Sequence, residues 1–338
     1  MLSSATVDKL NVLFCSAGRR VELLKAFRSA YQTLALKGSI IALDIDPMAP
    51  ALQVADRAYI VPRLDDSAFI PTLIEICRRE EVGLVFPLTD WDIPILSERR
   101  KEIEQTGARV AVVSPDAAKT AADKWLTMKL FQRLGLSTPK SWLPSDLDPD
   151  RMEYPLFIKP RKGSAAKETF KVGNRRELAF FLEYVHDPVV QEYLPGLEIT
   201  SDVICDLEGR LVGVVCRQRI EVRWGEVAKG VTVNNQEIIQ ACGRIARELP
   251  AVGAITVQCL LKDGQPCYTE INARLAGGIP LGIQAGVDAP LWLLARTAGV
   301  HVDIPPLGVY KSGIYMTRFD DSYFLSEADR AQLAGHRL

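Results

Sequence analysis

Three polar residues, Glu270, Asn272 and Arg274, are spaced two apart in the segment 268–274. On a β-strand this spacing places a carboxylate, an amide oxygen and a guanidinium group on one face. Hard divalent cations that carry nucleotide phosphates prefer oxygen ligands, and arginine binds phosphate. The pattern therefore predicts a site for a metal–nucleotide complex. The alternative is an amphipathic surface strand on which Glu270 and Arg274 pair across solvent.

A second strand is predicted just upstream of these residues. The apolar segment 255–261 is interrupted by a single amide, Gln258, and the dipeptide Asp263-Gly264 is typical of a β-hairpin turn. We expect this hairpin to place Gln258 beside Glu270. Two oxygen-bearing side chains would then face the same cation.

Basic residues lie at the ends of other predicted elements. The apolar strand 155–160 carries Lys159 near its end and leads into the segment 161–167, which is rich in basic and small residues. This segment is a candidate anion-binding loop. A further strand, 189–194, ends at a Pro-Gly turn that could join two subdomains.

The elements that must position these residues follow two patterns. Over 11–115, short apolar runs alternate with helical patterns, which predicts a doubly wound parallel sheet. A helix is predicted after Pro115, and a second one with Asp123 as its cap and an end near Gly135. Further elements are predicted as a β-meander at 199–205 and 211–217 and as helices at 176–184, 237–249 and 290–298.

The first predicted strand, 12–15, ends in the sequence Ser-Ala-Gly-Arg-Arg at 16–20, and the second is followed by Asp44. Dinucleotide-binding folds hold a pyrophosphate at such a strand end. Only one glycine is present where three are expected, and Arg19 and Arg20 would crowd a pyrophosphate bound to the backbone. An NAD oxidoreductase therefore ranks last among the functions that the sequence allows.

The composition is that of a globular protein. Of the 338 residues, 48% are hydrophobic and 25% are charged, and the formal net charge is -1. Neither nucleic-acid binding nor a polybasic membrane patch is predicted at this balance. The N-terminus lacks the basic and apolar regions of a leader, and no stretch of about eighteen apolar residues occurs, which predicts a cytoplasmic protein. The seven cysteines form no Cys-x-x-Cys pair and the three histidines lack metal-ligand spacing, so no zinc site is expected.

The order and spacing of the singled-out residues resemble the ATP-grasp superfamily, and within it stand-alone proteins similar to the large subunit of carbamoyl phosphate synthetase. The resemblance covers essentially the whole chain, and its strongest element is 270–274 with Gln258 upstream. The residues that carry it are Lys124, Lys159, Pro160, Gly163, Ser164, Gln191, Glu192, Glu198, Gln258, Glu270, Asn272 and Arg274.

The resemblance implies a mixed α/β and α+β fold in four parts. A Rossmann-like pre-ATP-grasp domain with the doubly wound parallel sheet would occupy residues 1–115. The two-subdomain ATP-grasp fold would follow, with a small subdomain, or lid, at 116–192 and a large subdomain with the Mg-ATP site at 193–310. Residues 311–338 would form a C-terminal segment.

The resemblance also implies a reaction in which ATP activates a carboxylate as an acyl phosphate. An amine or a similar nucleophile then attacks, with release of ADP and phosphate. Glu270, Asn272 and Gln258 match the ligands of one or two Mg²⁺ ions, which Mn²⁺ could replace. Arg274 matches the residue that holds the transferring phosphate.

Contacts to the nucleotide are implied as well. Lys159 and Lys124 match the cations on the α- and β-phosphates, and Glu198 matches the acid on the ribose. Gly163 and Ser164 fall in the phosphate-covering loop, which here has fewer glycines than is usual in the family, and alanine limits positive φ. The hinge that lies along adenine matches Gln191, Glu192, Tyr193 and Leu194.

The carboxylate substrate is expected against a second group of residues. Alternation predicts that Arg217, Arg219, Glu221 and Arg223 share one face, which could bind an acidic substrate or be a solvated sheet surface. The segment 224–230, which contains Glu226, is also expected to take part in carboxylate specificity. Among these residues, Arg219 and Lys229 are the candidate catalytic residues.

Two acidic residues follow the predicted strand 84–86, where the carboxyl edge of the first sheet would face the central cleft. Asp90 or Asp92 could hold an amine there, or could cap the next helix. The sequence does not decide between these roles.

A function of another class is also compatible with the sequence, namely a non-catalytic ATP-binding protein or one half of a split carbamoyl-phosphate-synthetase-like assembly. One ATP-grasp module is present in place of the two in the full subunit. Retention of Glu270, Asn272 and Arg274 favours an enzyme. The expected partners are a small-molecule carboxylate and an amine whose identities the sequence does not give, and a homodimer is a family-level expectation.

Overall fold

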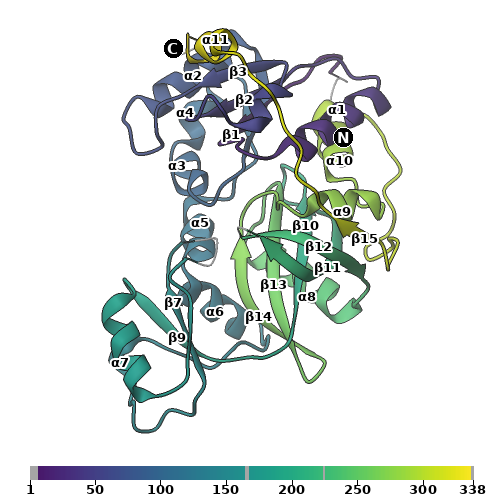
Figure 1. Ribbon diagram of the computed structural model, residues 1–338. Coiled ribbons are helices and arrows are strands. Elements are labelled where there is room, and N and C mark those ends of the chain that lie inside the picture. The colour runs from purple at the N-terminus through teal and green to yellow at the C-terminus, as the bar shows by residue number, and fades with distance from the viewer. Residues whose placement is uncertain (1–6, 164–166, 224, 336–338) are drawn as a thin grey trace.

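The protein contains three β-sheets in a computed structural model that describes residues 7–163, 167–223 and 225–335 (Figure 1). The first sheet has five parallel strands, and the second and third have four and six strands that pair antiparallel. Within these residues, none of the helices combines the length and the apolar character that a membrane span requires.

The parallel sheet has the strand order β3-β2-β1-β4-β5 and confirms the predicted doubly wound arrangement. The pattern does not predict β3, whose first residue is exposed. Of the four residues predicted as a strand at 110–113, only Val110 belongs to β5, although the Ala111 N–H still donates to the Val85 carbonyl of β4. The strands are β1 (Asn11–Cys15), β2 (Ile40–Asp44), β3 (Arg57–Ile60), β4 (Val82–Pro87) and β5 (Arg109–Val110). The helices are α1 (Val21–Thr33), the 3-10 turn η1 (Pro50–Gln53), α2 (Phe69–Arg79), α3 (Asp92–Glu98) and α4 (Arg100–Glu104).

Two loops leave the parallel sheet side by side. Strand β1 lies between β2 and β4, so the loop 16–20 after β1 and the loop 88–91 after β4 emerge at the same carboxyl edge. Open parallel sheets bind ligands at this point, where the strand order reverses. The Gly18 N–H donates to the Asp44 carboxylate over 2.7 Å, so the carboxylate at the end of β2 holds the first loop in place.

The second sheet forms a small separate body, the lid, in the order β6-β9-β7-β8. Its strands are β6 (Ser141–Trp142), β7 (Leu156–Pro160), β8 (Phe170–Val172) and β9 (Pro188–Glu192), with the 3-10 turn η2 (Pro144–Asp146) and helix α7 (Arg175–Tyr184). Its core is small and does not join the others: Leu156, Ile158, Val172, Leu178, Val185 and Val190.

Two helices connect the parallel sheet to the lid. Helix α5 (Pro115–Ala122) is capped by Ser114, and α6 (Lys124–Arg133) begins at the predicted cap, Asp123, whose carboxylate accepts from the N–H groups of the first turn. Both helices pack against β14 of the third sheet. They therefore fix the lid's first connection to the large sheet.

The third sheet is the largest, in the order β14-β13-β10-β11-β12-β15. Its strands are β10 (Leu197–Cys205), β11 (Leu211–Arg223), β12 (Glu226–Val233), β13 (Ala254–Lys262), β14 (Gln265–Asn272) and β15 (Tyr315–Thr317). Strand β11 is longer than the predicted 211–217, and β12 adds a strand that the pattern does not predict. The helices after the lid are α8 (Gln236–Glu248), α9 (Ile279–Gln284), α10 (Ala289–Ala298) and α11 (Glu327–Gly335).

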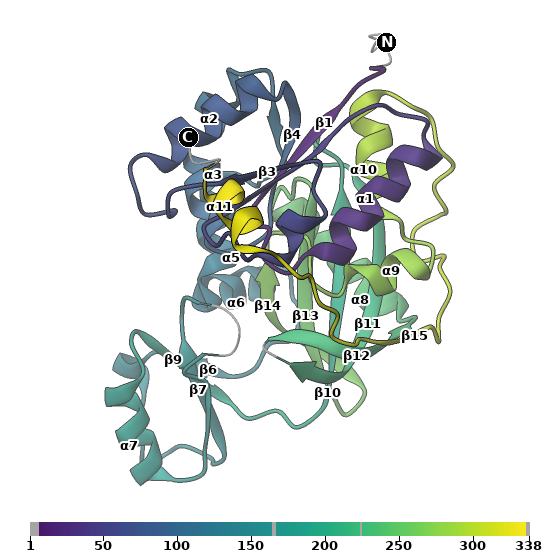
Figure 2. The same cartoon turned by 45° about the horizontal axis from the view of Figure 1, so that its top comes forward.

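The parallel sheet and the large sheet share their hydrophobic core. One buried cluster joins Leu13 and Val85 of the first sheet to Ile199 and Ile255 of the third. The chain after β15 crosses back and ends in α11 against β3, as Figures 1 and 2 show. The first and third sheets thus behave as one packed body with a C-terminal strap, whereas the lid has its own core. The four-part division at 115, 192 and 310 stays a prediction.

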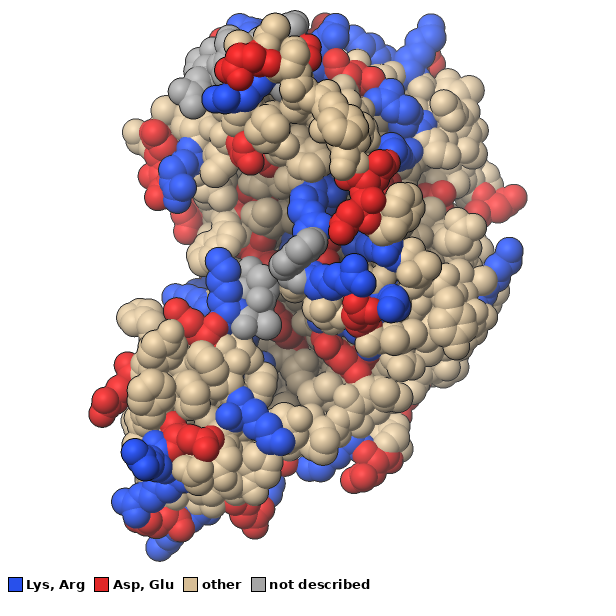
Figure 3. All heavy atoms as spheres, viewed as in Figure 1, with Lys and Arg blue, Asp and Glu red and all other residues tan. Residues whose placement is uncertain are grey.

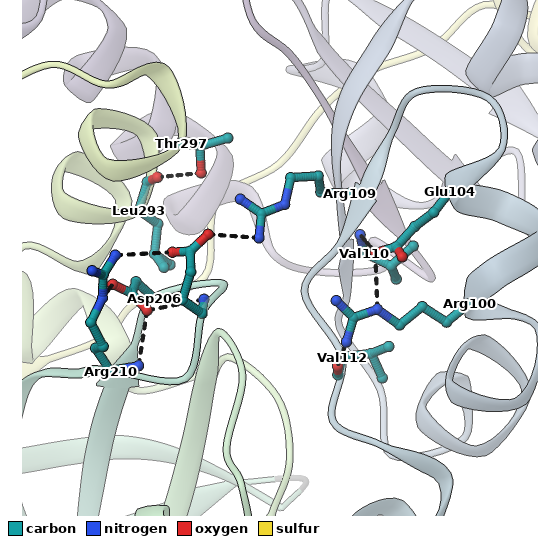
Figure 4. Close-up of polar contacts among 10 residues, drawn as sticks. Arg100, Glu104, Arg109, Val110, Val112, Asp206, Arg210, Leu293 and Thr297 are labelled. Carbon is teal, nitrogen blue, oxygen red and sulfur yellow. Dashed lines mark hydrogen bonds and ion pairs between the residues drawn. The ribbon is translucent and has the colours of Figure 1, made fainter. Parts of the chain in front are cut away.

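An ion pair at the rim also joins the first and third sheets. Arg109 of β5 lies 2.9 Å from Glu208 in the turn between β10 and β11. Figure 4 shows Arg109 pointing toward this turn, in which the Asp206 carboxylate accepts from the Arg210 guanidinium and backbone N–H. Both partners of the rim pair are about half exposed.

Candidate active site

The hairpin of β13 and β14 brings the predicted oxygen ligands together. Gln258 is the cross-strand partner of Glu270, and Asn272 lies two residues further along the same face. Asp263 and Gly264 have φ angles of 51° and 81°, as the predicted two-residue hairpin turn requires. The predicted juxtaposition of Gln258 and Glu270 is confirmed.

The amide of Gln258 is oriented by a neighbouring acid. Its Nε2 donates to Oε1 of Glu198 on β10 over 3.0 Å, and the same carboxylate oxygen accepts from Arg219 over 2.7 Å. Because the amide nitrogen is engaged, the amide oxygen of Gln258 remains to face a cation.

Lys159 lies at the end of β7 and is buried, with 7% of its surface exposed. Burial lowers the pKa of its ammonium group to about 8; Glu270 and Glu198 act in the opposite direction, and the charge of Lys124 adds to the lowering. The phosphates of a nucleotide would supply the negative charge that stabilises such a buried ammonium group. We call the site of Lys159, Glu198, Gln258 and Glu270 the nucleotide cleft, because the sequence predicts that a nucleotide binds there.

Lys124 is the first residue of α6 and also contacts the loop that follows β7. Its Nζ donates to the Gly163 carbonyl over 2.8 Å, and its N–H donates to the Arg161 carbonyl over 2.9 Å. Gly163 has a φ of 115°, which favours glycine at this position. The other predicted loop residue, Ser164, lies outside the described residues.

The predicted adenine hinge uses its side chains for structure. Gln191 is buried and donates to a serine hydroxyl of β6 over 2.8 Å. One oxygen of Glu192 accepts from the backbone before β6 over 3.0 Å, and the other lies 3.1 Å from the ammonium of Lys262 at the end of β13. Tyr193 lies 4.3 Å below a lysine ammonium group, and Leu194 is buried. The contact between Glu192 and Lys262 ties the lid to the hairpin, and the other contacts lie within the lid.

Two arginines of β11 lie against carboxylates of β10. Arg217 is fully buried and forms two contacts of 2.7 Å with Asp202, from Nε and Nη2. Arg219 forms the contact of 2.7 Å with Glu198 described above. These pairs fix both guanidinium groups on one side of the large sheet.

The predicted face of β11 does not continue beyond Arg219. The strand register shifts on both sides of Glu221, which interrupts the alternation. Arg223 and Lys229 both pair with Glu221 at 2.7 Å, and their side chains are about half exposed. Of the two candidate catalytic residues, the structure therefore places Arg219 beside Glu198 in the cleft, whereas Lys229 pairs with Glu221 at the register shift.

A cavity of about 280 Å³ lies where the carboxyl edge of the parallel sheet faces the large sheet. We call this cavity the boundary cavity. Figure 3 shows Lys and Arg side chains mixed with Asp and Glu side chains around the hollowed centre of one face of the molecule. Its charged lining residues are Arg20, Asp90, Arg217, Arg219, Glu226 and Arg274.

Two ion pairs cross the boundary cavity. The carboxylate comes from the first sheet in one pair and from the large sheet in the other. Asp90 from the loop after β4 lies 2.9 Å from Arg274, and Arg20 from the loop after β1 lies 2.9 Å from Glu226 of β12. Burial lowers the pKa of Arg20, and Glu226 partly offsets this effect. Each sheet thus contributes one arginine and one carboxylate to these pairs.

The structure gives Asp90 and Asp92 different roles. Asp92 is fully buried and accepts from the Ser16 hydroxyl over 2.6 Å and from the N–H groups of Leu88 and Thr89 over 3.0 and 2.8 Å. Burial raises its pKa. Asp92 therefore holds the two loops together, whereas Asp90 lines the cavity.

The sequence argument does not single out two residues of the boundary cavity. It assigns Arg20 only the effect of crowding a pyrophosphate, and it includes Glu226 in the segment expected to take part in carboxylate specificity without choosing it as a site residue. Position is the signal that could find Arg20, because it directly follows the first strand of a doubly wound sheet. No comparable signal marks Glu226, which reaches the cavity only because β12 pairs with β11.

The hairpin's donor set fits a hard divalent cation. Among the described residues, no group of three His, Cys, Asp or Glu side chains lies together. The predicted set instead contains one carboxylate, Glu270, and two amides, Gln258 and Asn272. Magnesium accepts so few protein ligands when phosphates and waters complete its shell.

Two family models match the chain, and together they define its class. A PylC-like N-terminal domain matches residues 12–111, and an ATP-grasp domain matches residues 121–278. A D-alanine–D-alanine ligase from Petrotoga mobilis is 31% identical over 219 residues, which cover 60% of this chain and 70% of that ligase. The chain belongs to the ATP-grasp family. The D-alanine–D-alanine ligase is a member of this family that forms a C–N bond.

Other relatives match the chain over part of their own length or in fold alone. A carbamoyl phosphate synthase large chain from Thermoanaerobacter sp. is 22% identical over 323 residues, covering 89% of this chain and 28% of that one. The chain spans about a quarter of the length of such large chains. An N5-carboxyaminoimidazole synthetase from Staphylococcus aureus, complexed with ADP, shares the fold with a TM-score of 0.70 and 14% identity, covering 92% of this chain and 82% of that one. An L-amino acid ligase from Bacillus licheniformis also shares the fold, with a TM-score of 0.67 and 17% identity. The match covers 87% of this chain and 75% of that ligase.

Proposed function

We propose that this protein uses Mg-ATP to activate a carboxylate as an acyl phosphate and joins it to an amine, releasing ADP and phosphate. The observation that supports this most directly is the continuity of the two regions through β14. Glu270 faces the nucleotide cleft, and Arg274, four residues further on, faces the boundary cavity. A nucleotide phosphate and an acid bound in the cavity would therefore meet between these residues.

The chemistry asks the protein for positioning and charge neutralisation. A carboxylate is a poor electrophile because its leaving group would be oxide. In the proposed first step a carboxylate oxygen attacks the γ-phosphorus and the bond to ADP breaks. In the second, the amine nitrogen attacks the acyl carbon, phosphate leaves, and the amine loses a proton. No protein nucleophile is needed, and Arg274 is the group that would hold the transferring phosphate.

The nucleotide cleft supplies the proposed contacts to ATP. Lys159 and Lys124 would bind the α- and β-phosphates, with Gly163 in the loop that covers them. Glu198 would bind the ribose, although its contacts with Arg219 and Gln258 would then be shared with the nucleotide. The backbone of 191–194 would lie along adenine, since the hinge side chains are engaged elsewhere.

One or two Mg²⁺ ions complete the proposal. Glu270, Asn272 and Gln258 would hold them, and the metal would neutralise charge on the β- and γ-phosphates as the phosphoryl group transfers. The protein's own contribution is to present three oxygen donors from one rigid hairpin.

The direct test is ADP release from Mg-ATP in the presence of mixtures of amino acids, hydroxy acids and dicarboxylates. We expect at least one mixture to stimulate release, and Glu270→Ala to lower the stimulated rate by about 100-fold or more. Glu248→Ala is the matched control, because Glu248 is an exposed residue of α8. If ATP binds tightly and no mixture stimulates release above the Glu270→Ala level, a non-catalytic ATP-binding protein or one half of a split assembly replaces the ligase.

A further inference from the structure

The boundary cavity contains side chains that no ATP contact uses. Arg20 and Asp90 come from the two loops at the point where the strand order of the parallel sheet reverses, which is where such sheets bind ligands. Their partners, Glu226 and Arg274, come from the large sheet and the chain just after it. The cavity is thus assembled from two domains and is complete only where they meet.

Two consecutive glycines provide space for Arg20 and Arg217. A Cβ on Gly277 would collide with the guanidinium group of Arg20 and with the carboxylate of Glu226, and a Cβ on Gly278 would collide with the guanidinium group of Arg217. Side chains at these two positions would push the arginines out of the cavity. The glycines therefore keep one wall open for two guanidinium groups.

The charges of the two crossed ion pairs are balanced before any ligand binds. The side chains of Arg20 and Arg274 are 14% and 16% exposed, and those of Asp90 and Glu226 are 25% and 35% exposed. A ligand with negative charge alone would draw Arg274 away and leave the partly buried Asp90 without its partner, which is costly. Glu226 would keep its contact with Arg318, 3.4 Å away. A ligand with both a carboxylate and an ammonium group would satisfy both partners of a crossed pair.

We propose that the boundary cavity binds the acid substrate as a zwitterion, an α-amino acid whose carboxylate lies on Arg274 and whose ammonium group lies on Asp90. The separation of 2.9 Å between Arg274 and Asp90 matches a ligand whose two charges are close neighbours. The second pair, Arg20 and Glu226, then faces the far end of the amino acid and selects a polar or charged side chain. This assignment rests on the proposed function, because it takes the acid bound here as the one to be activated.

Binding can be measured without turnover. Isothermal titration calorimetry of the full chain, with and without a non-hydrolysable ATP analogue and Mg²⁺, would compare each proteinogenic amino acid with its deaminated acid and its decarboxylated amine. We expect at least one amino acid to bind about tenfold or more tightly than either of its matched analogues, since each loses one charge-assisted contact.

Variants separate recognition from structure. Asp90→Asn should remove the preference for the amino acid over its deaminated acid, while binding of the deaminated acid does not weaken. Arg20→Gln should weaken binding of the preferred amino acid about tenfold and leave glycine nearly unchanged, and Gly277→Ala should do the same by displacing Arg20. Arg28→Gln is the control, because Arg28 on α1 forms an ion pair of similar length, 2.8 Å, with Asp56 away from the cavity.

The outcomes distinguish this inference from the proposed function. Equal binding of the deaminated acids, or no binding of any amino acid at millimolar concentration, overturns the zwitterion. A general loss of all ligands in Asp90→Asn and Arg20→Gln overturns the recognition roles. ADP release stimulated by a simple carboxylate would leave the ligase standing without the zwitterion. Amino-acid binding without ADP release would do the reverse. Because Glu270 does not line the cavity, Glu270→Ala should bind the amino acid normally in the titration without nucleotide.

Discussion

The nucleotide cleft and the boundary cavity lie next to each other but are built in different ways. The cleft takes Gln258 and Glu270 from one hairpin, with only eleven residues between them. The cavity pairs Asp90 with Arg274, which are 184 positions apart in the chain. A local hairpin fixes the first site, whereas the docking of two sheets fixes the second.

The electrostatics of the two regions differ as well. Lys159 in the cleft is buried, and its pKa is lowered to about 8 because burial outweighs the nearby carboxylates. In the cavity, Arg20 and Arg274 each meet a carboxylate at 2.9 Å. The difference teaches what each region suits. In the cleft, burial outweighs the carboxylates around Lys159, and the phosphates of a polyanion would supply the missing negative charge. In the cavity, Arg20 and Arg274 already have carboxylate partners, as the arginines of a site for a zwitterion should.

The largest effect is expected where the two regions join. Arg274→Gln removes the group that would hold the transferring phosphate and also frees Asp90, so kcat of ADP release should fall about 100- to 1000-fold. Steady-state kinetics would measure this, with Arg296→Gln, an exposed arginine of α10, as the control. A fall of less than about tenfold would remove Arg274 from the reaction centre.

A second prediction concerns a variant that changes the nucleotide cleft and leaves the boundary cavity unchanged. Lys159→Met removes the ammonium group of Lys159, whose pKa burial lowers to about 8. ATP affinity should fall about 10- to 100-fold, because a charge-assisted contact is lost. The nucleotide-free variant should nevertheless unfold about 2 °C or more above the parent at neutral pH. Calorimetry and thermal unfolding would measure the two effects.

The pH dependence of stability and of ATP binding follows from the lowered pKa of Lys159. The unfolded state holds the Lys159 proton up to about 10.5, but the folded state releases it at about 8. The penalty for burying the charge is thus fully present below about pH 8 and disappears as the pH rises toward about 10.5. The stability advantage of Lys159→Met should shrink over this window, while ATP binding by the parent weakens above about pH 8. An advantage that does not change with pH would contradict the assignment.

The contrast also explains how much the sequence could predict. Alternation and turn chemistry are local, so the hairpin, the cap at Asp123 and the parallel sheet follow from the chain itself. The even face predicted for β11 fails at Glu221, because a register shift depends on the pairing with β12. Arg20 and Glu226 meet only after two sheets dock, and no periodicity within either segment records that contact.

A third prediction concerns the strap that crosses between the sheets. Arg318, just after β15, contacts Glu22 of α1 at 2.6 Å, Glu226 at 3.4 Å and the Gly277 carbonyl. It touches the wall of the cavity without lining it, so it is a positioning residue. Arg318→Gln should raise KM for the acid about 3- to 10-fold and leave KM for ATP unchanged. Arg330→Gln in α11 is the matched control, and an equal rise of both KM values would indicate a general structural defect.

The smallest effect is expected at the rim of the same boundary. The side chains of Arg109 and Glu208 are 41% and 48% exposed, so their pair contributes little in water, and Arg109→Gln should lower the free energy of unfolding by less than about 1 kcal/mol. Gly253 at the same boundary has a φ of 69°, and a Cβ there would lie 3.1 Å from Cβ of Ala111. Gly253→Ala should therefore cost about 1 kcal/mol or more. Urea unfolding of the two variants would rank them, and a larger loss in Arg109→Gln would mean that rim charge, and not close packing, holds the two sheets around the cavity.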